Sequence, residues 1–113
     1  MILVDTSVWI DHLHKSVPAL VAALGRDEVL THPFVIGELA CGELRNRKEV
    51  LDLLSKLPRA VVASDDETLQ LIEARRLMGK GLGYIDVHLL ASAILSNARL
   101  WTADKRLLAF TGE

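Results

Sequence analysis

Four acidic residues lie next to apolar stretches of the chain and could together bind a divalent metal. Asp5 follows the apolar run 2–4, Asp104 follows the segment 100–102, and Glu38 and Asp86 lie among apolar residues of helical patterns. If the four carboxylates converge, they repel one another unless cations neutralise them. Hard divalent metals prefer oxygen ligands, activate water and stabilise the charge that develops on a phosphodiester. The four acids therefore predict a site for metal-dependent phosphoryl transfer.

The same acids also admit structural interpretations. Asp5 and Asp86 could serve only as helix caps, and Asp104 could be an ordinary turn residue. Glu38 is harder to explain in this way, because apolar residues lie on both sides of it.

Two further classes of function stay open as alternatives to a nuclease. One is another phosphoryl-transfer domain, either a phosphate-accepting receiver or an aspartyl phosphatase. A receiver needs an acidic pair after its first strand, and the phosphatase needs a second aspartate at position 7, where this chain has Ser7, so both fit poorly. The other is a binding module without activity, which a nuclease assay with and without metal would distinguish.

Short apolar segments alternate with helical patterns, as in proteins whose parallel sheet is covered on both faces. We expect strands at 2–4, 29–30, 60–63 and 100–102. We expect helices from near residue 8, then at 18–24, from 33, at 49–57, from 65 to about 78 and at 85–96, and a final turn from 104. This alternation predicts an α/β domain in which ligands gather at the carboxyl ends of the strands, where Asp5 and Asp104 fall.

Composition is that of one ordinary globular domain spanning residues 1–113. Half of the residues are hydrophobic and a quarter are charged, with a net charge of −2, which excludes intrinsic disorder. The apolar runs are far shorter than the roughly 20 residues that a membrane span needs. No basic segment precedes an apolar one at the start, so we expect no secretory signal, and the lone Cys41 fits a reducing, cytoplasmic compartment.

The remaining residues with chemical potential have simpler interpretations. The four histidines lack the spacing of a zinc site, so we expect surface or packing roles for them. Cys41 is expected to be a small buried side chain, and Trp9 and Trp101 are expected to pack against other residues.

Four segments together resemble the PIN-domain family. They are MILVDTSVWID at 1–11, PFVIGEL at 33–39, YIDVHLLASA at 84–93 and LWTADKRL at 100–107, in the family's order and over nearly the whole chain. The compact size is similar to that of the VapC-type toxins of toxin–antitoxin pairs. The resemblance implies a compact three-layer fold with a central parallel sheet and helices on both faces. The family usually extends further than Glu113, so we expect a shortened or missing final helix and edge strand.

The resemblance also implies an activity, that of an endoribonuclease dependent on Mg²⁺ or Mn²⁺. Asp5, Glu38, Asp86 and Asp104 would be its catalytic metal ligands, holding one or two ions. The hydroxyl groups of Thr6 and Thr102 would support those ligands. Which RNA is cut stays open among messenger, transfer and ribosomal RNA.

Eight basic residues could contact the phosphates of an RNA. Setting the four acids aside leaves 13 basic and 11 acidic side chains, a mildly basic remainder. The alternative for each is a solvated helix face. The eight form three groups: Arg45, Arg47 and Lys48; Arg75, Arg76 and Lys80; Lys105 and Arg106.

Protein partners are expected as well. The resemblance implies a small cognate antitoxin, and an arginine of that partner is suited to pair with the carboxylates and displace the metal. We expect an apolar surface for the antitoxin, or for a second copy in a homodimer, formed by Val8, Trp9, Leu13 and the leucines of 49–57.

Overall fold

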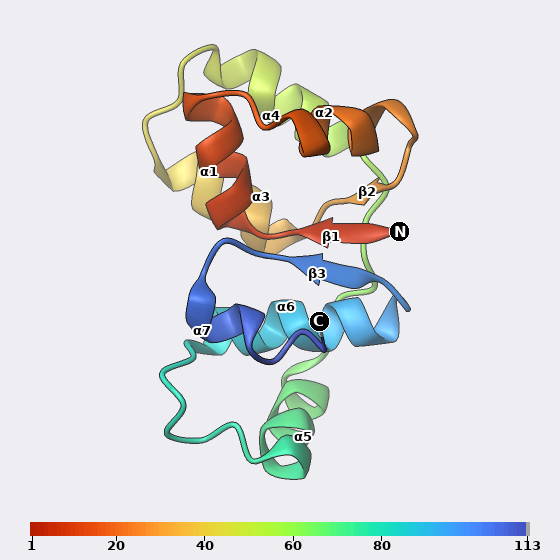
Figure 1. Ribbon diagram of the computed structural model, residues 1–113, viewed down its shortest axis with the longest axis vertical. Helices are drawn as coiled ribbons and strands as arrows, with labels where there is room; N and C mark the ends of the chain where they lie inside the picture. Colours follow the sequence, from red (N-terminus) through yellow and green to blue (C-terminus); the bar gives the residue numbers. More distant parts are fainter. Residues whose placement is uncertain (113) are drawn as a thin grey trace.

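A three-stranded parallel sheet lies at the centre of the protein in the computed structural model, which describes residues 1–112 (Figure 1). Its strands are β1 (Ile2–Val4), β2 (Val29–Leu30) and β3 (Arg99–Trp101), in the order β2-β1-β3. Residue Leu3 pairs with Leu30 on one side and with Leu100 on the other. Since β1 is the central strand, its carboxyl end lies in the middle of the sheet edge.

Seven helices lie on both sides of these strands among the described residues. In Figure 1, α1 to α4 lie above the strands and α5 to α7 lie below them. Their bounds are α1 Thr6–His14, α2 Pro18–Gly25, α3 Pro33–Cys41, α4 Arg47–Lys56, α5 Asp65–Arg75, α6 Tyr84–Leu95 and α7 Lys105–Leu108. The expected α/β architecture with a parallel sheet is confirmed, while Glu113, the last residue of the expected domain, lies outside the described residues.

The segment 60–63 is not a strand, contrary to the expectation from its sequence. Only one isolated parallel bridge forms there, between Thr31 and Arg59. Further along, the backbone N–H of Val61 donates to the hydroxyl of Ser96, the C-cap of α6, at 2.8 Å, and that of Ala63 donates to the hydroxyl of Ser92 within α6, at 3.1 Å. Serine side chains of a helix therefore take the place of a neighbouring strand, which an apolar pattern cannot reveal.

Several helix ends differ from the expected ones because local caps decide them. Helix α1 begins at Thr6, earlier than expected, because the Asp5 side chain accepts the first backbone N–H. Helix α5 ends at Arg75 instead of near residue 78, because Arg76 adopts a left-handed conformation with φ of 52°.

The hydrophobic core joins the sheet to helices on both sides. Val8 and Trp9 are 3% and 1% exposed and belong to this core, so the prediction that they form a docking surface is wrong. The expected packing role of Trp9 is confirmed, and Trp101 is partly buried against the same cluster.

Cys41 is exposed, and its expected burial is wrong. The core positions of α3 are Val35 and Leu39, one turn apart. Cys41 lies two residues beyond Leu39, which places it about 200° around the helix, on the opposite side.

Candidate active site

The Asp5 carboxylate lies at the carboxyl end of the central strand and is held by three hydrogen bonds. Its Oδ1 accepts the backbone N–H of Thr6, and its Oδ2 accepts the hydroxyls of Ser7 and Thr102, all at 2.8 Å. Asp5 is 6% exposed, yet no Lys, Arg or His among residues 1–112 forms an ion pair with it. Neutral donors thus fix the orientation of the carboxylate. Its negative charge is not paired with a basic side chain of residues 1–112.

Glu38 joins this centre from helix α3. The Thr6 hydroxyl donates to Glu38 Oε1 at 2.7 Å, so Thr6 links the glutamate to the first turn of α1. Val35 and Leu39 anchor α3 in the core, and the Glu38 side chain is exposed beside them.

Asp104 joins the centre from the opposite side, through Thr102 at the end of β3. The Thr102 hydroxyl donates to Asp5 and accepts the backbone N–H of Asp104 at 3.0 Å. Asp104 Oδ1 in turn accepts the backbone N–H of Arg106 at 2.8 Å, as the cap of α7. Thr6, through its N–H and its hydroxyl, and Thr102, through its hydroxyl, therefore connect three acids that lie far apart in the sequence.

Asp86 occupies the first turn of α6 and has different partners. Its Oδ2 accepts the backbone N–H of Gly83 at 3.0 Å. Within residues 1–112, no hydrogen bond joins Asp86 to Asp5, Glu38 or Asp104. The structure thus links three of the four predicted acids and places the fourth at the start of a neighbouring helix.

A group of histidine and aromatic side chains fixes that start of α6. Asp65 Oδ1 accepts the Tyr84 hydroxyl at 2.8 Å and lies 3.1 Å from His88 Nε2. The contact with His88, followed by the hydrogen bond from Tyr84, lowers the pKa of Asp65. The hydrogen bond to Asp65 raises the pKa of Tyr84. His88 is 3% exposed and packs edge-on against Phe34 and Tyr84, which confirms a packing role for it.

The donor set suits a hard divalent cation. Carboxylates and hydroxyls supply only oxygen, and none of the four acids has a basic partner among residues 1–112. In that part of the chain, no three His, Cys, Asp or Glu side chains form a ready-made cage. Mg²⁺ typically needs no such cage, since it binds through one or two carboxylates, waters and substrate phosphates. The residues therefore fit Mg²⁺ or Mn²⁺ better than a fully protein-ligated ion.

Ser7 is a member of this centre that was not among the predicted site residues. Its hydroxyl donates to Asp5 Oδ2 and accepts the backbone N–H of Ala103 at 3.0 Å. It ties the first turn of α1 to the segment after β3. The available signal was a hydroxyl two residues after a strand-end aspartate, a spacing that allows a local hydrogen bond.

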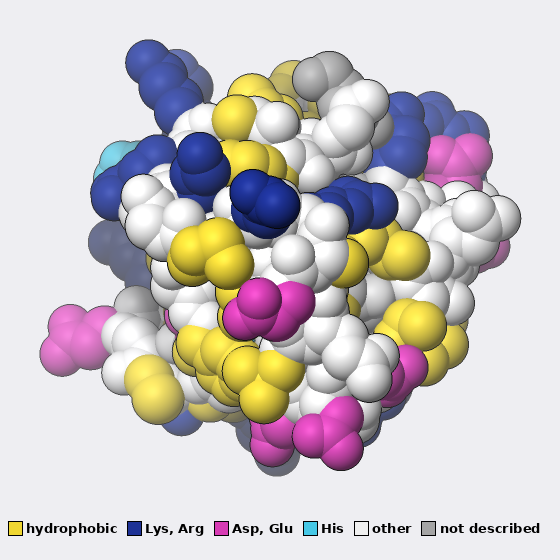
Figure 2. Space-filling view, turned by 90° about the horizontal axis from the view of Figure 1, so that it is seen from below, with side chains coloured by type: hydrophobic (Ala, Val, Ile, Leu, Met, Phe, Trp, Pro, Cys, Tyr) yellow, Lys and Arg dark blue, Asp and Glu magenta, His cyan; other side chains and the backbone are white. Residues whose placement is uncertain are grey.

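The eight candidate RNA-binding residues are all exposed. Figure 2 shows Lys and Arg side chains in a band across one edge of the face it presents, with Asp and Glu mostly on the other side. Arg47 also has a structural role, because its guanidinium donates to the carbonyls of Ala40 and Gly42 at the end of α3.

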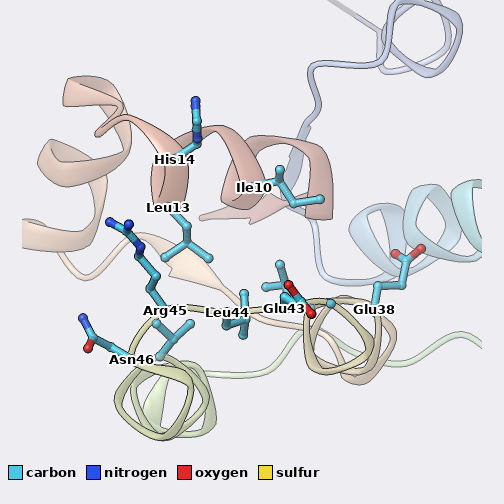
Figure 3. Close-up of a pocket in the computed structure, with 11 residues that line it drawn as sticks. Ile10, Leu13, His14, Glu38, Glu43, Leu44, Arg45 and Asn46 are labelled. Atoms are coloured by element: carbon cyan, nitrogen blue, oxygen red, sulfur yellow. The ribbon is translucent and has the colours of Figure 1, made fainter.

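An open pocket of about 590 Å³ lies between α1 and the connection from α3 to α4. Ile10 and Leu13 of α1 line it from one side and Leu44 from the other, as Figure 3 shows. Glu38 lies at one end and Arg45 at the opposite end. Since Glu38 also contacts Thr6, the apolar pocket leads directly to the carboxylate centre.

No helix among residues 1–112 is long and apolar enough to cross a membrane.

The family model of the PIN domain matches residues 2–112. The chain is 54% identical to a protein named Ribonuclease VapC32 in two strains of Mycobacterium tuberculosis, CDC 1551/Oshkosh and ATCC 25618/H37Rv. Each alignment runs over 114 positions and covers 100% of this chain and 92% of the relative. This chain is therefore a member of the PIN-domain family.

Proposed function

We propose that this protein is an endoribonuclease that depends on Mg²⁺ or Mn²⁺ and acts as the toxin of a type II toxin–antitoxin pair. The relatives named above are ribonucleases. The observation that carries the proposal is the buried Asp5 carboxylate, which forms no ion pair within residues 1–112. Thr6 connects it to Glu38 of α3, and Thr102 connects it to Asp104, beyond the end of the adjacent strand β3.

The four acids act together in this proposal, as ligands of the same metal centre. Asp5, fixed by three donors, holds a divalent cation together with Glu38, Asp86 and Asp104. The bound cation supplies an activated water and stabilises the charge that develops on the phosphodiester. The hydroxyls of Thr6 and Thr102 keep the carboxylates oriented, so that little reorganisation is needed when RNA binds.

The basic side chains supply affinity for the RNA backbone. Phosphate contacts by exposed Lys and Arg position a nucleic acid without reading its bases, and they weaken as salt rises. The eight exposed basic residues, with Arg47 sharing a structural role, are the proposed contacts.

The proposed antitoxin binds the pocket between α1 and the α3–α4 connection. An amphipathic segment can cover Ile10, Leu13 and Leu44 there, and a residue at its end reaches Glu38. An arginine at that point can pair with the carboxylates and displace the metal. The proposed antitoxin site is therefore this pocket and not a surface around Val8 and Trp9, because both of these side chains are buried in the core.

The first test compares RNA cleavage by the parent protein with cleavage by variants of the acids. Asp5→Asn keeps the size of the side chain but removes the charge that holds the cation, so cleavage should fall by orders of magnitude. Glu38→Gln and Asp86→Asn should act in the same way, and a chelator should stop the parent enzyme. Asp11→Asn, an exposed residue of α1, is the matched control and should retain the parent rate.

Thermal unfolding provides a second measurement on the same proteins. Millimolar Mn²⁺ should raise the Tm of the parent by mass action on the folded state, and Asp5→Asn should reduce that shift. Full activity of the three acid variants, or no effect of chelation, would show that the proposed metal mechanism is wrong. A parent protein that cleaves no RNA with or without metal would favour the binding module without catalysis.

A further inference from the structure

The side chain of Arg106 lies directly against the backbone of Gly81. A Cβ atom added to Gly81 would lie 3.0 Å from Arg106 Cδ and 3.3 Å from Nη1, closer than such contacts normally allow. Gly81 also has a φ of 80°, which L side chains rarely adopt. A second glycine of the same loop, Gly79, has a similar φ of 70° but nothing within 4 Å. Of these two positions, only Gly81 therefore needs glycine for the close approach of a side chain.

This contact connects the two parts of the candidate active site that the hydrogen bonds leave separate. Arg106 follows Asp104 by two residues, and its backbone N–H donates to Asp104 Oδ1. Gly81 precedes Gly83 by two residues, and the Gly83 N–H donates to Asp86 Oδ2. In Figure 1, α7 lies beside the start of α6, and the loop from α5 leads into the same place.

The positive charge of Arg106 has no partner of its own. Within residues 1–112, its guanidinium forms neither a hydrogen bond nor an ion pair, whereas the guanidinium of Arg47 donates to two carbonyls. The stem of Arg106 rests on Gly81, and its five N–H donors stay available. A planar, permanently charged donor group of this kind suits the oxygens of a phosphate.

We propose that Arg106, held on Gly81, binds a backbone phosphate of the RNA between Asp86 and Asp104 and so sets the position of the strand at the carboxylates. The proposal rests on the proposed ribonuclease function and singles out one of the eight basic residues. It makes Gly81 a positioning residue, which acts through the arginine that lies against it.

The test measures RNA binding in the uncleaving Asp5→Asn background, with fluorescein-labelled single-stranded RNA of mixed sequence and Mg²⁺ at several salt concentrations. Adding Arg106→Gln should raise the Kd about tenfold and should lower the salt slope of binding by about one phosphate contact. Arg106→Lys should recover part of the affinity, because it keeps the charge but loses the two-pronged geometry.

The two glycines provide matched variants. Gly81→Ala and Gly79→Ala carry the same left-handed backbone strain, so both should lower the Tm to a similar extent. Only Gly81→Ala makes the Arg106 side chain shift, so it should weaken RNA binding in the same direction as Arg106→Gln but less, while Gly79→Ala should bind RNA as its parent does. When the same substitutions are made in the protein with Asp5 intact, KM for RNA cleavage should rise in the variants that bind RNA more weakly and should stay unchanged in Gly79→Ala.

Three outcomes would overturn the proposal. Equal Kd values and salt slopes for Arg106→Gln and its parent, while Asp5 is still required for cleavage, would refute it and leave the ribonuclease function standing. A change in the Mn²⁺-induced Tm shift without a change in RNA affinity would mean that Arg106 only arranges the acids. If the unsubstituted protein, with Asp5 intact, neither binds nor cleaves RNA, both proposals are refuted.

Discussion

Two of the three groups that bond to the Asp5 carboxylate also satisfy a backbone N–H of the segment after β3. The Ser7 hydroxyl accepts from Ala103, and the Thr102 hydroxyl accepts from Asp104. Each hydroxyl therefore acts at once as a donor to the acid and as an acceptor for the chain beyond the strand. Removal of one hydroxyl leaves a backbone N–H without its partner and leaves Asp5 Oδ2 with one hydroxyl donor instead of two.

Thr102→Val tests this arrangement at the scale of one residue, because valine keeps the shape and removes only the hydroxyl. Cleavage should fall about 10–100-fold, since Asp5 loses a donor that orients it. The free energy of unfolding should fall by about 1–3 kcal/mol, because the Asp104 N–H loses its partner and Asp5 Oδ2 keeps only the Ser7 hydroxyl as a donor. Rates on labelled RNA and urea unfolding would measure both effects.

Thr111→Val is the control for that substitution. The Thr111 hydroxyl donates to the carbonyl of Leu108 in an exposed turn away from the acids. Its loss should leave the cleavage rate unchanged. If Thr102→Val cleaves RNA as fast as Thr111→Val, the hydroxyl does not orient the carboxylate.

At the scale of elements, α6 holds the segment 60–63 and the start of α3 through one buried serine. Ser92 Oγ lies 3.0 Å from His32 Nε2 and accepts the backbone N–H of Ala63. His32 Nδ1 accepts the N–H of Phe34 and thereby caps α3. An acceptor at Nδ1 requires the neutral ring with its proton on Nε2, where it donates to Ser92.

Ser92→Ala and Ser96→Ala are a matched pair for this connection. Ser92→Ala leaves the Nε2–H of His32 and the N–H of Ala63 unpaired in the core, so unfolding should become easier by about 2 kcal/mol or more. Ser96→Ala removes the partner of only one group, the N–H of the exposed Val61, to which water can bond instead. The free energy of unfolding should therefore fall by less than about 1 kcal/mol. Similar losses in urea unfolding would contradict this account.

The same histidine gives the fold a dependence on pH. Burial, with smaller effects from the charges of His88 and Arg59, lowers the pKa of His32 from 6.5 to about 4. Between these values the unfolded chain binds more protons than the folded one. The contribution of His32 to stability is therefore complete above pH 6.5 and is lost as the pH falls toward 4, by about 3 kcal/mol in all.

Urea unfolding at pH 7 and pH 4.5 would measure this loss, and NMR would follow the ring of His32 directly. In His32→Asn the amide oxygen can still accept from Phe34 but does not titrate, so the fall in stability should be smaller than in the parent. His14→Gln, at an exposed position of α1, should keep the fall of the parent. A His32 ring that titrates near 6.5 would contradict the prediction.

At the scale of the whole molecule, the open pocket and the carboxylate centre form one continuous surface, because Glu38 belongs to both. A protein that occupies the pocket can therefore reach the acids without entering the core. A homodimer also stays a prediction, and its interface would have to use side chains other than Val8 and Trp9.

Leu13→Asp should separate inhibition from catalysis. Leu13 is 39% exposed and lines the pocket, so an aspartate there should prevent co-purification with the proposed antitoxin, while RNA cleavage continues. Leu53→Asp is the control, since Leu53 is 47% exposed on α4 and lies outside the pocket lining. Loss of co-purification with Leu53→Asp alone would place the antitoxin on another surface.

The α/β alternation, the parallel sheet and the family could be predicted from the residues alone. Apolar runs such as 2–4 and helix signals such as Pro33 are local, so they can be recognised without knowledge of the fold. The position of Asp5 at a strand end followed in the same way, because one strand fixes which residue comes after it.

Which groups meet at the site depends on how the elements pack in three dimensions. Ser7 and Thr102 bond to the same carboxylate oxygen although 95 residues separate them, and the close fit of Arg106 on Gly81 joins two loops. Hydrogen bonds and contacts of this kind depend on distances across the fold, which residue types and spacing along one chain do not encode. For the same reason the burial of Trp9 and the missing strand at 60–63 appeared only once α1 and α6 were packed against the sheet.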